Sequence, residues 1–111
     1  MKTFTDDEMK ALLPTAKAYS VMILKQGPNF TDDTAPAIIW EHGRRNFGLR
    51  HDGVLAVVLP VPDGSDVCGI GVFTGTVEET VEVMNDDPGV QAGVFTFEVH
   101  GCLGFPGDSL P

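Results

Sequence analysis

The amino-acid sequence predicts a single α+β domain over residues 1–111, with elements in the order β-α-β-β-α-β, the ferredoxin-like or split βαβ arrangement. Three observations predict it. Short runs of apolar and β-branched residues alternate with longer segments of helical period. Two helix-start signals of the form Thr-x-x-Glu divide the chain. The strand-like runs are apolar on both faces, which is typical of a sheet covered on both sides. Right-handed crossovers then put the helices on one face of a four-stranded antiparallel sheet.

The first element lies outside this pattern. Thr5 and Glu8 form a capping box, which predicts a short helix over about residues 6–13 that ends near Pro14. Because it precedes the first strand, we interpret residues 1–17 as an N-terminal helical extension.

The first βα unit follows. Residues 18–25, AYSVMILK, are predicted to be a strand. A polar loop then leads to Thr34 or Asp33 as the cap of a long helix with Pro36 in its first turn. This helix is expected to end near Asp52, because Gly53 is suited to the position after a helix.

Two strands, a helix and a last strand complete the domain. Strands are predicted at residues 54–61 and 67–74, joined by the turn PDGSD. Thr76-x-x-Glu79 is a second capping box and opens a helix that runs to about residue 85. The last strand is expected at 94–99, followed by a Gly/Pro-rich tail at 100–111.

The first two strands predict a partner for the sheet. Val21 and Ile23 point to one side of the first strand and Met22 and Leu24 to the other. In the second strand, an apolar pair likewise lies on each side: Val57 and Leu59 against Leu55 and Val58. Two helices cover only one face, and an exposed apolar face on a small domain indicates an interface. We therefore expect a homodimer joined through the sheet face, with the N-terminal helix or the tail folding over this face as the alternative.

Composition excludes several classes of function. The net charge of −9, from sixteen acidic and seven basic residues, argues against binding to nucleic acid or to an anionic membrane surface. No apolar run is long enough to span a bilayer, and the N-terminus lacks the apolar core of a signal peptide. We therefore expect a cytoplasmic protein.

No cofactor or metal ion is predicted. Cys68 and Cys102 form no CxxC motif, and the three histidines lack ligand spacing. Gly69-x-Gly71 is a near miss for a dinucleotide fingerprint, but it lies inside a strand rather than between a strand and a helix.

The chain from residue 19 to 99 resembles the YCII-related (YciI-like) family of dimeric α/β-barrel proteins. The matching pieces are the strand YSVMILK, the helix that carries His42, the strand GIGVFTG and the helix TVEETVEVM. The most specific piece is Asp87-Pro88-x-Val90-x-Ala92-Gly93-Val94. The sequence departs from the family in its additional first helix, in Leu59-Pro60 at the end of the second strand, and in Gly43 after the histidine.

The resemblance implies that His42 and Asp87 form the active site. Taken alone, a helical histidine is more often a packing or surface residue, and Asp87 before Pro88 has the chemistry of a turn that ends a helix. If both act, Pro88 fixes the backbone and Asp87 accepts the Nδ1 proton of His42. The Nε2 nitrogen would then serve as the base or acid. Asp86 is expected to be a plain solvent-facing residue.

Two functions of different class are therefore expected. The first is a small cofactor-independent enzyme, and the resemblance allows a lyase-like reaction such as dehydrochlorination of a ring substrate. In that case Arg45 would support an oxyanion or bind the substrate, and Trp40 and Phe47 would line a pocket for a flat ring, with core packing as the alternative for both. The second is a non-catalytic dimer that binds a small ligand or another protein. A monooxygenase is a third hypothesis, which rests on fold analogy alone.

Overall fold

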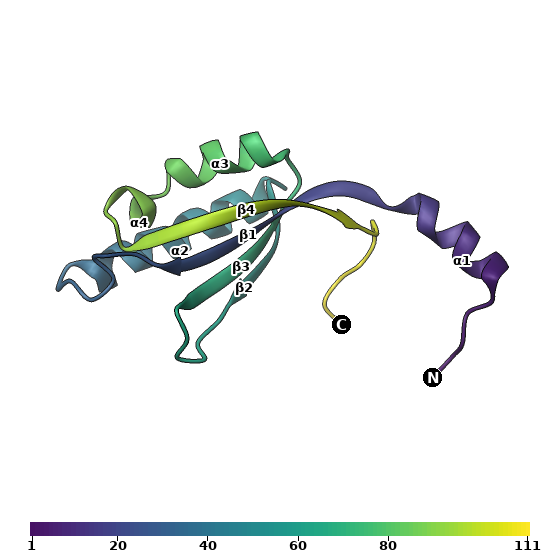
Figure 1. Cartoon of the computed structure of the whole chain (residues 1–111). Coiled ribbons are helices and arrows are strands. Elements are labelled where there is room, and N and C mark those ends of the chain that lie inside the picture. The colour runs from purple at the N-terminus through teal and green to yellow at the C-terminus, as the bar shows by residue number, and fades with distance from the viewer.

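The structure is a computed structural model that describes all 111 residues, and it shows an α+β domain with one four-stranded antiparallel sheet (Figure 1). The strand order is β2-β3-β1-β4. The strands are β1 (Lys17–Gln26), β2 (Leu55–Pro60), β3 (Val67–Phe73) and β4 (Phe95–Gly104). The helices are α1 (Asp6–Leu12), α2 (Ala35–His51), α3 (Val77–Asn85) and α4 (Pro88–Gln91), and a 3₁₀ turn (Leu13–Thr15) follows α1.

The helices α2, α3 and α4 cover one face of the sheet (Figure 1). α2 packs against β2 and α4, while α3 packs against β4 and β1. This arrangement is compatible with the predicted ferredoxin-like fold. No helix is both long enough and apolar enough to cross a membrane.

Local signals set several of the predicted boundaries. Both capping boxes are present: the Thr5 and Thr76 hydroxyls accept the backbone N–H of Glu8 and Glu79, whose carboxylates accept the N–H of the two threonines. Gly53 follows α2 with φ of 76°, a conformation that a residue with a side chain rarely adopts. These three predictions are confirmed.

Thr34 is the N-cap residue of α2, one of the two predicted caps, but its side chain does not cap the helix. Thr34 precedes the helix, but its backbone is already helical, with φ of −81° and ψ of −13°, and its side chain makes no capping hydrogen bond. A capping side chain needs an extended backbone to reach the first amides of the helix. Here the chain already turns before the helix, and the Ala35 N–H donates to the Asp32 carbonyl.

The last strand is longer than predicted, and the expected tail begins later. β4 continues to Gly104, because each residue of β1 from Lys17 to Gln26 pairs with a residue of β4. Gly104 lies against the Tyr19 ring, where a side chain would come within 3.0 Å of a ring carbon. Gly104, which was assigned to a tail because of the Gly/Pro-rich sequence, therefore allows two chain segments to approach closely inside a sheet.

A β-bulge decides which side chains of β2 face the helices. The register shifts between Leu55, which pairs with Phe73, and Val57, which pairs with Val72. The extra residue turns the chain, so that Leu55 and Val58 both lie toward the core although they are three positions apart. The predicted division of β2 between its two faces is therefore consistent with the structure.

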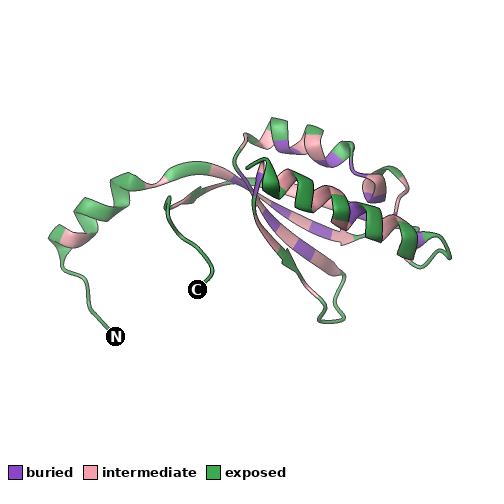
Figure 2. Cartoon of the chain, turned by 180° about the vertical axis from the view of Figure 1, so that it is seen from behind, coloured by how far each residue is buried: buried purple, intermediate pink, exposed green.

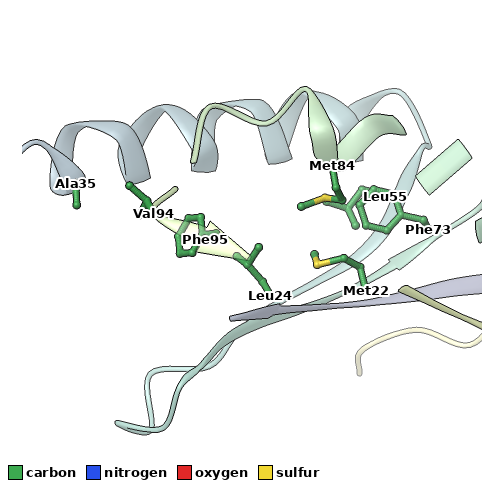
Figure 3. Close-up of a cluster of buried hydrophobic side chains, with 8 residues drawn as sticks. All are labelled: Met22, Leu24, Ala35, Leu55, Phe73, Met84, Val94 and Phe95. Atoms are coloured by element: carbon green, nitrogen blue, oxygen red, sulfur yellow. The ribbon is translucent and has the colours of Figure 1, made fainter. Parts of the chain in front are cut away.

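The core lies between the sheet and the three helices (Figure 3). It consists of eight buried apolar residues: Met22, Leu24, Ala35, Leu55, Phe73, Met84, Val94 and Phe95. Only 15 of the 111 residues are buried, so the chain alone leaves much apolar surface in contact with water.

The opposite face of the sheet is apolar and is covered by no helix of the chain (Figure 1). Val21 pairs with Val72 and Ile23 with Ile70, so these four side chains form one patch on the side away from the buried Met22 and Leu24. All four are only half-buried. Figure 2 shows that α1 and the C-terminal tail lie away from the body, so neither folds over this patch.

Candidate functional site

The predicted histidine lies on the inner face of α2. His42 is 8% exposed, and its ring packs on Phe95 with 4.8 Å between the ring centroids. A helix places residues four positions apart on one face, so Asn46 lies directly beside it. The histidine is therefore held between a helix and the start of β4 rather than free at the surface.

The predicted aspartate is the N-cap of the short helix α4. Asp87 is completely buried and has an extended backbone, as its place before Pro88 requires. Its Oδ2 accepts the backbone N–H groups of Gly89, at 2.9 Å, and Val90, at 3.2 Å. Two hydrogen bonds thus fix one oxygen of the carboxylate, and the other is aimed away from the turn. Asp86 beside it is exposed, as predicted.

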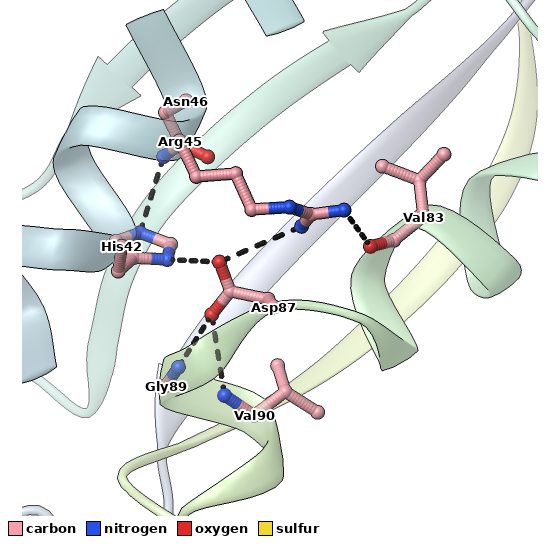
Figure 4. A network of polar contacts seen from close by, with 7 residues as sticks. All are labelled: His42, Arg45, Asn46, Val83, Asp87, Gly89 and Val90. Carbon is pink, nitrogen blue, oxygen red and sulfur yellow. Dashed lines mark hydrogen bonds and ion pairs between the residues drawn. The ribbon is translucent and has the colours of Figure 1, made fainter. Parts of the chain in front are cut away.

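The fold brings the two residues together across 45 positions of sequence (Figure 4). His42 Nδ1 lies 2.8 Å from Asp87 Oδ1, and His42 Nε2 lies 3.1 Å from the Asn46 side-chain nitrogen. A carboxylate accepts only, so Nδ1 carries the proton and donates it to Asp87. Nε2 of the neutral ring is then an acceptor, and the Asn46 amide donates to it.

Arg45 braces the aspartate from the other side. Its Nη2 donates to the Val83 carbonyl at 2.8 Å, and its Nη1 lies 3.7 Å from Asp87 Oδ1 (Figure 4). Nη1 has no hydrogen-bond partner, so it acts on Asp87 only through its charge. The guanidinium is turned toward α3 and α4.

These contacts keep Asp87 ionised. Burial raises the pKa of a carboxyl group, but the hydrogen bond and charge of His42 and the amides of Val90 and Gly89 oppose it. The net pKa of Asp87 is lowered from its ordinary value. A buried carboxylate that stays charged fixes the orientation and tautomer of its histidine.

Gly89 makes room for this arrangement. A side-chain carbon at this position would lie 2.5 Å from a ring carbon of Phe95 and 3.0 Å from Asp87 Oδ2. The absence of a side chain therefore lets the Phe95 ring pack beneath the turn while Asp87 reaches the backbone amides.

A cavity of about 270 Å³ opens beside the pair, between α2 and the β1–β3 part of the sheet. Its wall is formed mostly by apolar groups, and His42, Asn46 and Cys68 contribute the polar side chains. The remaining lining residues are Met22, Leu24, Ile39, Gly43, Phe47, Leu55, Val58, Leu59, Pro60, Gly69, Ile70, Gly71 and Phe95. Burial, and then the charge of Asp66, raise the pKa of the Cys68 thiol, which therefore stays protonated at neutral pH.

The other predicted binding residues are divided between two places. Phe47 lines the cavity, whereas Arg45 and Trp40 do not. Trp40 lies on the outer face of α2 and is 69% exposed, and Phe47 is 66% exposed. Neither aromatic residue packs in the core, which was the alternative interpretation.

Asn46 and Cys68 are site residues that were not predicted. The signal for Asn46 was present, because it follows His42 by four positions on a predicted helix. Cys68 lines the cavity, and the register between β1 and β3 shifts at this position. The orientation of its side chain could not be predicted from the alternation along a regular strand.

The arrangement provides one oriented imidazole at the wall of an apolar cavity. No three histidine, cysteine or carboxylate side chains lie together in a way that could hold a metal ion.

In comparisons with known proteins, no family model matches the chain, and no curated protein matches it.

Proposed function

We propose that the chain is a small cofactor-independent enzyme in which His42, oriented by Asp87, transfers a proton in a reaction of a small apolar or aromatic substrate. The observation that carries the proposal is the buried His42–Asp87 hydrogen bond of 2.8 Å at the wall of the cavity. A buried charged group such as Asp87 is expensive to keep and is more frequent at functional sites than elsewhere, and its partner His42 lines the cavity.

The geometry supports His42 as a general base. With Nδ1 donating to Asp87, Nε2 is unprotonated and belongs to a residue that lines the cavity. It can take a proton from a carbon next to a carbonyl or from a phenol, while the electron pair moves into the substrate. Asp87 stabilises the imidazolium that forms. In an elimination, chloride would leave with its bonding electrons, as the resemblance to the YCII-related family suggests.

Asn46 has a defined place in this scheme. Its amide donates to Nε2 at 3.1 Å and must release that nitrogen before a proton is taken. The released amide N–H is then a donor beside the cavity, suited to an oxyanion that develops on the substrate. Asn46 therefore positions the base at rest and is the nearest uncharged donor to the reacting atoms.

The cavity favours an uncharged substrate. Arg45, the cation beside the pair, is turned toward Val83 and Asp87 and does not line the cavity. With apolar walls and a chain of net charge −9, a carboxylate or phosphate group would find no cationic side chain in the cavity wall. The predicted role of Arg45 in substrate binding would require its side chain to turn.

One observation favours the second function, a non-catalytic dimer that binds a small ligand. The Asn46 amide occupies Nε2, so no free base is presented when the cavity holds no substrate. In such a protein His42 and Asn46 would recognise a ligand by hydrogen bonds, and the cavity walls would supply the affinity.

Membership of the YCII-related family and the dimeric α/β barrel belong to the same proposal. The apolar sheet face formed by Val21, Ile23, Ile70 and Val72 supports a second copy packed face to face about a twofold axis. Light scattering should give twice the chain mass of 11.9 kDa. The mass of a single chain at micromolar concentration would contradict the dimer.

The test of the catalytic proposal combines binding with proton exchange. Uncharged phenols and cyclic ketones are added to the protein, and the NMR signals of His42 and the Asn46 side chain are followed. Bound ketones are then examined for uptake of deuterium from D₂O at the carbon next to the carbonyl. Wild type should catalyse this uptake, and His42→Gln should lose about 10²-fold or more of the rate, the usual contribution of a general base.

Two other results are informative. Binding at His42 without deuterium uptake above the His42→Gln background would refute the catalytic proposal and favour the ligand-binding module. Phenols or ketones that bind without moving the His42 and Asn46 signals would show that this cavity is not the binding site.

A further inference from the structure

The N-terminal arm, residues 1–16, leaves its own apolar side chains in water. No residue of α1 is buried, and Phe4, Met9, Leu12 and Leu13 are all exposed. Met9, Leu12 and Leu13 have the spacing i, i+3, i+4, which places them on one side of the helix. An isolated helix of 7 residues is marginal in water, so this amphipathic arm is suited to a docking surface.

The arm does not find that surface within its own chain. It projects from the end of the sheet away from α2, α3 and α4, which makes the molecule 56 Å long but only 29 and 21 Å in the other directions (Figures 1 and 2). An arm extended in this way is placed to reach a neighbouring molecule.

A matching groove lies along α2, next to the His42 cavity. It has a volume of about 470 Å³ and is lined by Pro36, Ile39, Trp40, Gly43, Arg44 and Phe47. Trp40 and Phe47 stand on either side of Gly43, and no atom lies within 4 Å of the place where a Gly43 side chain would be. Large exposed aromatic residues on either side of a glycine form a groove in which an apolar helix can bind.

The charges of the two surfaces are complementary. The first turn of α1 carries Asp6, Asp7 and Glu8, whereas the groove contains Arg44, which is exposed. Arg44 uses its Nε for Glu41, so the other N–H groups of its guanidinium are free to meet a carboxylate. Opposite charges at the rim of an interface fix orientation and speed association.

We propose that the N-terminal arm docks on a second copy of the chain, with Met9, Leu12 and Leu13 in the α2 groove between Trp40 and Phe47. Under twofold symmetry each copy gives and receives an arm, so the contact occurs twice. Ile39, Gly43 and Phe47 line both the groove and the His42 cavity, so the docked arm lies next to the catalytic site of its partner.

Trp40 reports on the contact directly, because it is the only tryptophan of the chain. Its fluorescence is measured with acrylamide as quencher over a range of protein concentrations. Docking between copies predicts that Trp40 becomes less accessible as the concentration rises, with a midpoint that gives the affinity.

Two variant pairs test which surfaces meet. The double variant Leu12→Asp/Leu13→Asp should raise the midpoint by about 30-fold or more, the size expected for loss of hot-spot contacts. Leu110→Asp, which changes another exposed leucine, in the tail, should leave it unchanged. Arg44→Glu should raise the midpoint, and Arg50→Glu on the same helix outside the groove should not.

Two results would overturn the docking proposal. Equal access to Trp40 at all concentrations overturns the proposal, including when light scattering shows a dimer, which would then use the sheet face alone. Protection of Trp40 that survives Leu12→Asp/Leu13→Asp also overturns it, because another surface then covers the groove. Loss of proton exchange in His42→Gln neither depends on these results nor decides them.

Discussion

Replacing Asp87 by asparagine isolates the charge of the candidate dyad. Asparagine has nearly the same shape, is as good an N-cap as aspartate, and keeps an oxygen for the amides of Gly89 and Val90. It loses the negative charge and places an amide toward His42. The turn therefore survives, while the bond between the imidazole and a carboxylate does not.

The structure sets the size of the expected effect. Asp87 is completely buried, and a hydrogen bond that involves a charged group contributes about 1.5–3 kcal/mol. Asp87→Asn should therefore lower the free energy of unfolding by about 2 kcal/mol, and the nearby positive charge of Arg45 adds to this loss. Asp87→Ala should cost about 1 kcal/mol more, because the cap of α4 is lost as well.

The assay is urea unfolding of the wild type and the variant, first at neutral pH and then with acidification. Because the Asp87 pKa is lower in the folded chain, its contribution to stability is complete above the unfolded pKa of about 3.9. It is lost as the pH falls through that value toward the lower folded one. The difference in stability between wild type and Asp87→Asn should therefore shrink below about pH 4.

The neighbouring aspartate provides the control. Asp86→Asn changes an exposed residue and should stay within about 0.5 kcal/mol of wild type. If Asp87→Asn behaves like Asp86→Asn, or if its deficit does not change on acidification, a buried ionised Asp87 that bonds His42 is refuted. Asp87 would then be a turn residue, and the catalytic proposal would lose its support.

Three further substitutions, the first with a control, test local contacts of the fold. Gly89→Ala should cost about 1–3 kcal/mol in urea unfolding, because its methyl group would lie 2.5 Å from a Phe95 ring carbon. The control is Gly48→Ala, whose methyl group would meet no atom within 4 Å and which should stabilise α2 by about 0.5–1 kcal/mol. Asn46→Ala should cost about 1 kcal/mol and speed acylation of the imidazole at Nε2, and an unchanged acylation rate would show that the amide does not shield it. Thr76→Ala should lower stability by about 1 kcal/mol through loss of the α3 capping box, and a loss below that of an exposed mid-helix substitution would contradict this role.

The sequence by itself determined the features that depend on near neighbours. The two capping boxes need only a threonine and a glutamate three positions apart, and the end of α2 needs only a glycine at position 53 that tolerates a positive φ. The order of the four strands and of α1, α2 and α3 followed from local patterns in the same way, whereas the short helix α4 was expected to be a turn. Thr34 occupies the N-cap position of α2, one of the two predicted, but its side-chain hydrogen bond is absent because the chain already turns before the helix.

Only the tertiary structure decided the features that depend on distant partners. Gly101 and Gly104 gave no strand signal, yet they pair with Ser20 and Lys17 of β1, and Gly104 lies against the Tyr19 ring. The family resemblance pointed to His42 and Asp87, but only the structure shows the 2.8 Å bond between them. It also shows that the Asn46 amide bonds His42 Nε2 and that Arg45 bonds the Val83 carbonyl instead of lining the cavity. Trp40 and Phe47 are large aromatic residues of a kind that often packs in a core, but both are exposed: Trp40 lies on the outer face of α2, and Phe47 lines the cavity beside His42. The distant neighbours of a side chain depend on the register of the strands and on how the helices cross the sheet. Short-range sequence patterns do not encode either of these.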